Sequence, residues 1–334
     1  MYYLTLNYSI ATVFLAQIKK RFIITIMQKV FTITGNLLAE TTSRFDMPEI
    51  GQTVRAIGAS KFQVGGKGVN VARTLASLGI DCSAIVFPAG FIGQKCIDFL
   101  FRENFDVISI SINGETREGL VCVDSNGVQT TFLGSDLPIP ESAFETCLKK
   151  IEAQINCDDI VALCGSFPNW QTSYAQKLSK LCEEKKVYFC VDTYGAPLND
   201  IADCHCDFLK FNKSELLSFL VSKGEKVDCY SQEIFEFARN KYFSKAKIFA
   251  ITDGSNTTFV SDKNDTIKIT PQKIENEISA TGCGDALFGV AISEIFIKKS
   301  SLKKSFERAS KYATLTAKCE ETAVLSQDKI KTIF

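Results

Sequence analysis

Two glycine-rich segments have the residue types and spacing that could hold a phosphate group. In the first, "VGGKGVN" at residues 64–70, Gly65, Gly66 and Gly68 surround Lys67, and a pattern typical of a helix follows at once. Glycines cluster where the backbone makes a tight turn or closely approaches another group. The spacing excludes a Walker A loop, in which Ser or Thr follows the lysine, and a Rossmann fingerprint, which needs a glycine three residues after Gly68.

What remains is a glycine-rich turn at the N-terminus of a helix. Free N–H groups and the helix dipole attract polar or anionic ligands to such a place. Asn70 lies in the first turn, and its amide can both donate and accept hydrogen bonds, which suits a sugar hydroxyl. Taken alone, the segment fits a structural turn with Lys67 in solvent equally well.

The second segment, "SATGCGDALFGV" at residues 279–290, repeats this arrangement near the C-terminus. Gly282 and Gly284 flank Cys283, and Asp285 enters the helix that follows. Consecutive backbone amides there can form an anion-binding concavity. A carboxylate repels phosphate, so Asp285 is best explained if it accepts a hydroxyl proton while the amides hold the phosphoryl group in transfer. The alternative is a favourable charge at a helix N-terminus; with both segments in one chain, catalysis is the favoured interpretation.

The elements that must position these segments alternate along the chain from Val30 onward. A parallel sheet covered by helices on both faces is the architecture that such alternation predicts. Strands are expected at 29–35, 82–90, 160–168, 187–195, 207–212 and 247–254, and helices at 70–79, 93–104, 174–186, 214–224, 282–299 and 301–318.

Two stretches interrupt the alternation. Residues 41–64 and 107–133 read as strands and turns without helices, and "DSNG" in the second is a hairpin-type turn. We expect them to form a small antiparallel sheet that projects from a single domain at 29–334.

The first 28 residues read as a non-core extension. "YLTLNYSIATVFLAQI" is fairly apolar, but no positive segment precedes it, no cleavage site is evident, and it is too short to span a bilayer. The globular pattern begins at "MQKVFTITGN", so Met27 is the expected start of translation. A weak membrane anchor is the alternative.

Composition narrows the function classes. The 334 residues hold 38 basic and 38 acidic side chains, which argues against a nucleic-acid partner. The 13 cysteines are scattered without a framework, so a reducing, cytoplasmic location is expected. Because the apolar N-terminal stretch is too short to span a bilayer, no membrane partner is expected. The single histidine, His205, lies between Cys204 and Cys206, but metal-binding pairs are usually spaced more widely and no second pair is near.

The segments "GGKGVNVARTLASLG" and "GCGDALFGV" together resemble the two signatures of the PfkB-type, ribokinase-like carbohydrate kinases. Four shorter segments agree with that family in order along the chain: "LCGSFP", "KFNKSEL", "ITDG" and "ETREGL". The last resembles a T-R segment of the hexose-phosphate kinases, so 1-phosphofructokinase and tagatose-6-phosphate kinase are the nearest types.

The resemblance implies an α/β fold, a three-layer α/β/α sandwich with a mainly parallel central sheet and a small β-sheet lid. It also implies an ATP-dependent kinase that uses Mg²⁺ to phosphorylate a hydroxyl of a sugar or sugar phosphate. Asp285 is then the catalytic base. The amides of Gly282, Cys283 and Gly284 form the anion hole.

Further roles follow from the resemblance position by position. In the sugar site, Gly66 allows a close approach of the backbone and Lys67 neutralises phosphate charge. The other expected site residues are Glu40 and Asn70 for the sugar, Arg117 in the lid for a substrate phosphate, Thr252 and Gly254 for the nucleotide, and Asn212 and Glu215 for Mg²⁺ through water. A homodimer, if formed, is expected through the lid.

The chain departs from the family pattern at three places. Glu40 stands where the family usually has Asp, Ser279 and Ala280 stand where many members have Asp-Thr or Asn, and Cys283 replaces a small Ala or Ser. Two other functions stay open. A kinase of an unphosphorylated sugar or nucleoside would leave Arg117 an ordinary lid residue. A non-catalytic sugar- or nucleotide-binding protein would have no need of Asp285.

Overall fold

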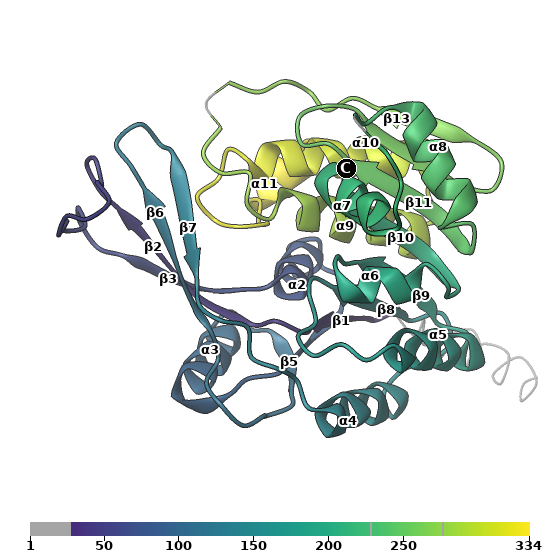
Figure 1. Cartoon of the computed structure of the whole chain (residues 1–334), viewed down its shortest axis with the longest axis horizontal. Helices are drawn as coiled ribbons and strands as arrows, with labels where there is room; N and C mark the ends of the chain where they lie inside the picture. The colour runs from purple at the N-terminus through teal and green to yellow at the C-terminus, as the bar shows by residue number, and fades with distance from the viewer. Residues whose placement is uncertain (1–27, 228, 276) are drawn as a thin grey trace, which may run out of the picture.

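The computed structural model describes residues 28–227, 229–275 and 277–334, which build one large sheet, one small sheet and the surrounding helices (Figure 1). The large sheet has the strand order β13-β12-β11-β10-β9-β8-β1-β4-β5. Neighbours from β5 to β11 pair in parallel, whereas β12 and β13 form an antiparallel hairpin on the edge. The strands are β1 (Val30–Thr34), β4 (Cys82–Val86), β5 (Asp106–Ser109), β8 (Ile160–Cys164), β9 (Tyr188–Asp192), β10 (Cys206–Asn212), β11 (Ala246–Thr252), β12 (Thr258–Ser261) and β13 (Thr266–Ile269).

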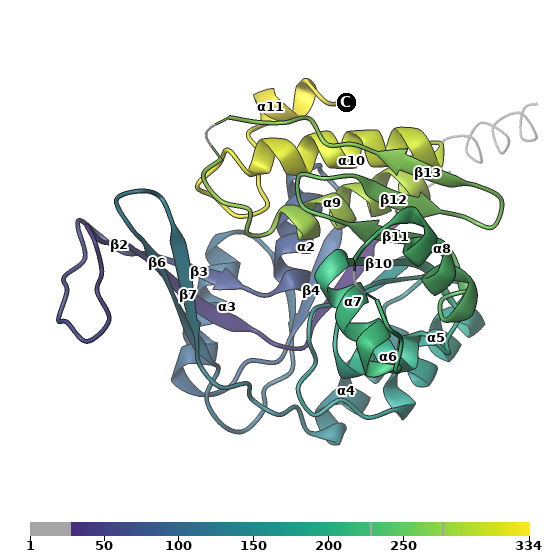
Figure 2. The same cartoon turned by 45° about the horizontal axis from the view of Figure 1, so that its top comes forward.

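Helices cover both faces of this sheet, because side chains of the central strands alternate between two cores. In β1, Phe31 and Ile33 belong to one core and Val30 to the other. The first core is covered by α4 (Glu141–Glu152), α5 (Ser173–Lys185), α6 (Ala196–Ile201), α7 (Lys213–Ser222) and α8 (Gln232–Lys241). The second is covered by α2 (Lys67–Ser77), α9 (Cys283–Ile292), the π-helix η1 (Ser293–Ile297), α10 (Leu302–Thr316) and α11 (Gln327–Lys331). Figure 2 shows α9 and α10 on the side of the sheet opposite α4 and α5.

The predicted three-layer sandwich with a mainly parallel sheet is confirmed. Every residue of β1, β4 and β8 is buried, as expected of parallel strands that helices cover on both sides. A third, smaller apolar core lies between α3 (Gly90–Arg102) and the base of the small sheet.

The small sheet is a lid that projects from the body, with the order β3-β2-β6-β7 (Figure 1). Its strands are β2 (Leu38–Arg44), β3 (Lys61–Gly65), β6 (Glu118–Val123) and β7 (Gln129–Leu133). The prediction of a purely antiparallel lid is wrong, because β2 and β6 pair in parallel. Residues 107–109 are also not part of it: α3 returns the chain beside β4, so β5 extends the large sheet instead.

The expected extension lies outside the described residues, except for Gln28. Among the described helices none is both long enough and apolar enough to cross a membrane. All 13 cysteines are free thiols.

Candidate active site

The strand order itself marks a place for a ligand. From β1 the chain moves through β4 to β5 on one side, and then continues on the other side through β8, β9, β10 and β11. In open α/β sheets the crevice between two such neighbours, here β1 and β8, binds ligands at the carboxyl ends of the strands. The lid strand β2 also leaves from the end of β1, so it borders this crevice.

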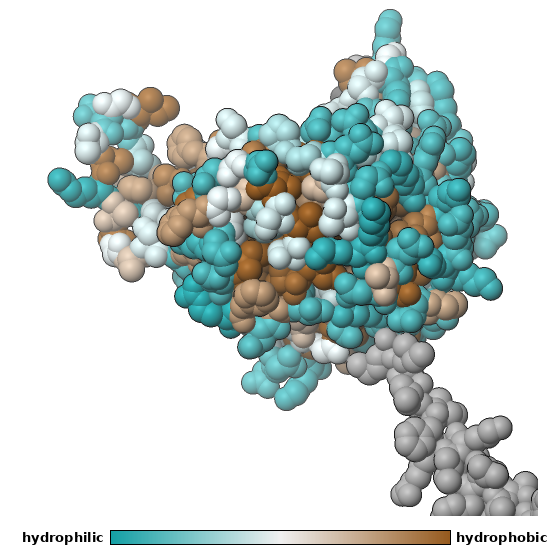
Figure 3. Space-filling model, turned by 90° about the horizontal axis from the view of Figure 1, so that it is seen from below, coloured by the Kyte–Doolittle hydropathy of each residue, from teal (hydrophilic) through white to brown (hydrophobic). Residues whose placement is uncertain are grey.

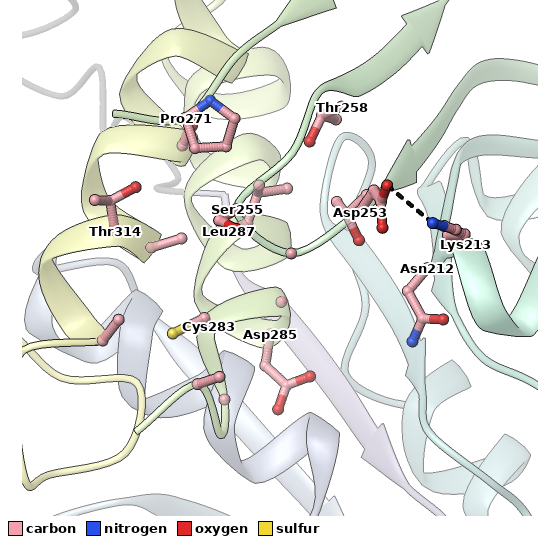
Figure 4. Close-up of a pocket in the computed structure, with 18 of the residues that line it drawn as sticks. Asn212, Lys213, Asp253, Ser255, Thr258, Pro271, Cys283, Asp285, Leu287 and Thr314 are labelled. Atoms are coloured by element: carbon pink, nitrogen blue, oxygen red, sulfur yellow. Dashed lines mark hydrogen bonds and ion pairs between the residues drawn. The ribbon is translucent and has the colours of Figure 1, made fainter. Parts of the chain in front are cut away.

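A cleft of about 800 Å³ continues from this region towards β10, β11 and α9. Its walls include Asn212, Thr252 and Gly254, at the ends of β10 and β11, and the segment 282–285 at the start of α9. Figure 4 shows Asn212 and Asp285 on facing walls, with the ion pair between Lys213 and Asp253 (3.3 Å) beside Asn212. The cleft therefore joins the segments expected to bind nucleotide with those expected to catalyse.

Asp285 is held inside the first turn of α9. Gly282, the N-cap, has φ 79°, and a Cβ there would come within 2.5 Å of Thr322, so only glycine fits. The side chain of Asp285 is buried, and its Oδ2 accepts a hydrogen bond from Nδ2 of Asn70 at 2.8 Å. Burial raises the pKa of Asp285 to about 6, against the opposing effect of Lys67. A carboxylate with that pKa can accept a proton near neutral pH.

Not all of the backbone amides expected to form the anion hole are free to donate to an anion. The amide of Cys283 already donates to the carbonyl of Ala280 at 3.2 Å. The amides of Gly284 and Asp285 lie in the first turn of α9, where a helix offers backbone donors no internal acceptor. The Nζ of Lys210 lies 3.1 Å from the position of a Cβ on Gly284, so a cation adjoins these amides.

Lys67 and Lys210 share one buried carboxylate. Lys67 Nζ contacts Asp192 Oδ1 at 2.9 Å and Glu215 Oε1 at 3.1 Å, and Lys210 Nζ contacts Asp192 Oδ2 at 2.7 Å. Burial alone would raise the pKa of Asp192, but Lys210 and Lys67 outweigh it and hold this pKa below its usual range. The charge of Lys67, expected to face a phosphate, is therefore matched by two carboxylates. The ionised side chains that meet here are Lys67, Lys210, Asp192, Glu215 and Asp285, so this charge cluster has one more negative charge than positive.

Asn212 and Glu215 form a capping box at the start of α7. Asn212 Oδ1 accepts from the Glu215 amide at 2.9 Å, and Glu215 Oε2 accepts from the Asn212 amide at 2.8 Å. Within residues 28–227, 229–275 and 277–334, no three His, Cys, Asp or Glu side chains are grouped as a metal site. Mg²⁺ in kinases needs only one or two carboxylates besides phosphates and water, and carboxylate oxygens that keep free lone pairs fit that role through water.

On the lid side, Glu40 is buried in β2 and accepts a hydrogen bond from Gln63 Nε2. The same nitrogen lies 3.3 Å from Thr322 Oγ1, next to Gly282, so Glu40 connects to the start of α9. Gly66 has φ 122°, and a Cβ there would come within 2.6 Å of Thr34. Gly66 is thus explained by the approach of α2 to β1, a structural reason that differs from the expected approach to a sugar.

Arg117 immediately precedes β6, at the junction of lid and body. Its Nη1 donates to Asp136 Oδ1 at 2.8 Å, and its Nη2 lies 3.4 Å from the carbonyl of Asn36. Asn36 Nδ2 donates both to Asp136 Oδ1 and to Ser166 Oγ, at 2.9 Å each. Asn36 follows β1 and Ser166 follows β8, so this cluster lies over the crevice between those strands.

The fold brings five further residues to the site that were not expected from the sequence: Asn36, Asp136, Ser166, Asp192 and Lys210. Two of them had a signal. Lys210 lies within the apolar strand "FLKFN", where a lysine is rarely buried unless it is paired, and Asp192 ends a buried parallel strand. Asp136 lies in a loop whose sequence gave no such indication.

The chain is similar in sequence to known proteins. Residues 36–329 match the family described as pfkB family carbohydrate kinase. Tagatose-6-phosphate kinase of Staphylococcus epidermidis is 24% identical over 311 residues, covering 91% of this chain and 97% of the relative. 1-Phosphofructokinase of Borreliella burgdorferi is 27% identical over 261 residues, covering 77% of this chain and 82% of the relative.

Among solved structures, phosphofructokinase-2 from Escherichia coli in complex with potassium superposes with a TM-score of 0.81. The superposition covers 92% of this chain and 98% of that one, at 20% identity. The chain belongs to the pfkB family of carbohydrate kinases and has the ribokinase-like fold.

Proposed function

We propose that this kinase transfers the γ-phosphoryl group of ATP to a hydroxyl of a sugar phosphate, with Asp285 as the base. The observation that carries the proposal is the buried carboxylate of Asp285, whose pKa is raised to about 6, at the start of α9. The adjoining amides are the donors proposed to face the transferring group, and Lys210 lies beside them while it is paired with Asp192. A non-catalytic binding protein would have no need to bury a carboxylate there.

The nucleotide is assigned to the cleft lined by Thr252 and Gly254. A volume of about 800 Å³ falls in the range typical of small-molecule sites. Glu215 and Asn212 are the residues proposed to hold Mg²⁺ through water, and the bound ion would neutralise charge on the phosphates. Because Lys67 is bound to Asp192 and Glu215, we assign it to balancing this charge cluster and to lowering the pKa of Asp285.

The sugar is assigned to the side of the lid, near Asn70 and Glu40, with Arg117 for its phosphate. Relatives named for tagatose 6-phosphate and 1-phosphofructokinase activity support a phosphorylated substrate. A kinase of an unphosphorylated sugar is the second candidate. The observation that favours it is the ion pair of Arg117 with Asp136, which already provides the guanidinium with an anion.

A homodimer through the lid is also proposed. Apolar side chains are exposed on the lid, which projects at the left of Figure 3 with brown groups on its surface. They are Met47, Ile50, Val54, Ile57, Val128, Phe132 and Leu133. Seven of the 13 large apolar side chains exposed among the described residues lie on the lid, which is why the lid is the surface proposed for the interface. The free cysteines are compatible with the proposed cytoplasmic location, where thiols stay reduced.

One screen tests the proposal: ATP turnover coupled to ADP detection over a panel of hexose phosphates and their unphosphorylated parents. Turnover with a hexose phosphate that falls by about 100-fold or more in Asp285→Asn supports it. Turnover with the parent sugars only would replace it with the second candidate. Sugar binding without turnover by any substrate would show a binding protein.

A further inference from the structure

The cluster of Arg117, Asp136, Asn36 and Ser166 has a property that the proposed function does not use. Asp136 is an anion already bound to the guanidinium that is assigned to the substrate's phosphate. Its carboxylate is held in place from two directions, because Arg117 Nη1 and Asn36 Nδ2 donate to the same oxygen, Oδ1. Asn36 is in turn fixed by Ser166. Asp136 therefore has a defined position over the crevice.

The accessible parts of Arg117 are limited. Its side chain is 13% exposed, and its Nε is buried with no hydrogen-bond partner in the described part of the chain. A void beside it, of about 10 Å³, is large enough for about one water molecule and too small for a phosphate. Its Nη2 faces the carbonyl of Asn36.

Asp136, by contrast, is 53% exposed. A phosphate that approaches Arg117 from solvent must therefore come along the Nη1 edge, where Asp136 lies. A dianionic phosphate and a carboxylate on one guanidinium edge repel each other and compete for the same N–H donors.

We propose that Asp136 is a specificity-determining residue, which weakens the binding of phosphorylated sugars by competing for Arg117. The proposal rests on the proposed function, in that it takes Arg117 as the group nearest the sugar's phosphate end. Asp136 lowers the preference for a sugar phosphate over its parent sugar and leaves nucleotide binding unaffected.

The test is Asp136→Asn, which keeps the size of the side chain and removes its charge. Glu145→Gln is the matched control, because Glu145 is also a partly exposed carboxylate in an ion pair, which joins it in α4 to Lys177 in α5, and it does not line the cleft. Calorimetric titration of the full chain with tagatose 6-phosphate, tagatose and inorganic phosphate measures binding without turnover. KM values for ATP and for the sugars, measured with any substrate that the screen identifies, give a second readout.

Asp136→Asn is expected to bind tagatose 6-phosphate about tenfold more tightly than the wild-type chain. This is the size of effect expected when a half-exposed negative charge at hydrogen-bond distance is removed. Binding of tagatose and the KM for ATP should change less than twofold, and Glu145→Gln should match the wild type. In an Arg117→Ala background the same substitution should have no effect, because the two residues act on each other.

Unchanged or weaker phosphate binding by Asp136→Asn, including no binding by either protein, overturns the proposal. An equal gain with and without Arg117 also overturns it. The failure of the proposed function is a separate result: it shows in the turnover screen of the wild-type chain, whereas the competition shows in the titrations.

Discussion

Replacement of Asp285 by Asn should greatly reduce turnover while nucleotide binding persists. Asn has the size of Asp and an oxygen that can still accept the hydrogen bond from Asn70 (2.8 Å), but it cannot take a proton from a hydroxyl. General-base catalysis contributes about 10²- to 10⁴-fold, so kcat should fall by that factor, or about 3–5 kcal/mol of transition-state stabilisation. Turnover close to the wild-type rate would refute the role of Asp285.

The pH dependence gives the same prediction a second readout. The pKa of Asp285 is about 6, and the base must be ionised, so kcat/KM should be at its plateau above pH 7 and fall about tenfold per pH unit below 6. The phosphate of a sugar phosphate also titrates near pH 6. The residual activity of Asp285→Asn at the same pH values is therefore the control, because it retains the substrate's titration and lacks that of the enzyme.

Asp285→Asn should make the folded chain more stable, although it makes the enzyme less active. Because the folded-state pKa of Asp285 lies above the ordinary value of 3.8, ionisation destabilises the folded chain, and stability falls as pH rises from about 4 to 6. Asp285→Asn removes this penalty, at most about 3 kcal/mol at pH 7 to 8. Thermal unfolding should show a higher Tm for the variant at pH 7.5 and no difference below pH 4. An Asp285→Asn variant less stable than the wild type at pH 7.5 would contradict the conclusion that the ionised Asp285 destabilises the folded chain.

Three further predictions concern other parts of the chain. Arg117→Ala should raise KM for a sugar phosphate roughly tenfold or more, at about 1.5–3 kcal/mol for hydrogen bonds to a charged group, with KM for ATP unchanged; equal effects on phosphorylated and parent sugars would contradict the assigned role. Lys210→Met should lower kcat and raise KM for ATP, and it should also lower the Tm because Asp192 loses a partner at 2.7 Å. Lys210→Arg should retain part of the kcat, of the ATP affinity and of the Tm. Steady-state kinetics and thermal unfolding check this, and an unchanged KM for ATP in Lys210→Met contradicts it. Removal of residues 1–26 should leave fold and activity intact, because β1 begins at Val30 and pairs on both edges with β4 and β8. An insoluble or inactive truncated chain would contradict the expectation that these residues are a non-core extension.

The residues that would do the chemistry could be proposed from the sequence because their signals are local. A glycine that must adopt positive φ, as Gly282 does, and a carboxylate three residues later lie within one turn of chain. The same holds for the alternation of strands and helices, which depends on the period of apolar residues over about ten positions. Even α4, which was not predicted, has such a signal, since its buried residues Ala143, Phe144, Cys147 and Ile151 recur at helical spacing.

Other features depend on which segments meet in space, and local patterns do not contain that information. Residues 108–112, Ile-Ser-Ile-Ser-Ile, alternate between apolar and polar side chains, a pattern that would suit either sheet. Only the pairing of 106–109 with β4 decides that this segment extends the large one. The pKa of Asp285 depends on burial and on charges 75 to 218 residues away in the sequence, at Lys210, Asp192 and Lys67.

The pairing of Lys67 with Asp192 and Glu215, and of Arg117 with Asp136, is equally a product of the fold. The sequence by itself indicated a candidate catalytic carboxylate at a helix N-terminus, and a lysine expected to face a phosphate. The tertiary structure decided which carboxylates Lys67 and Arg117 already bind, because ion pairs form between side chains that are close in space, whatever their separation along the chain.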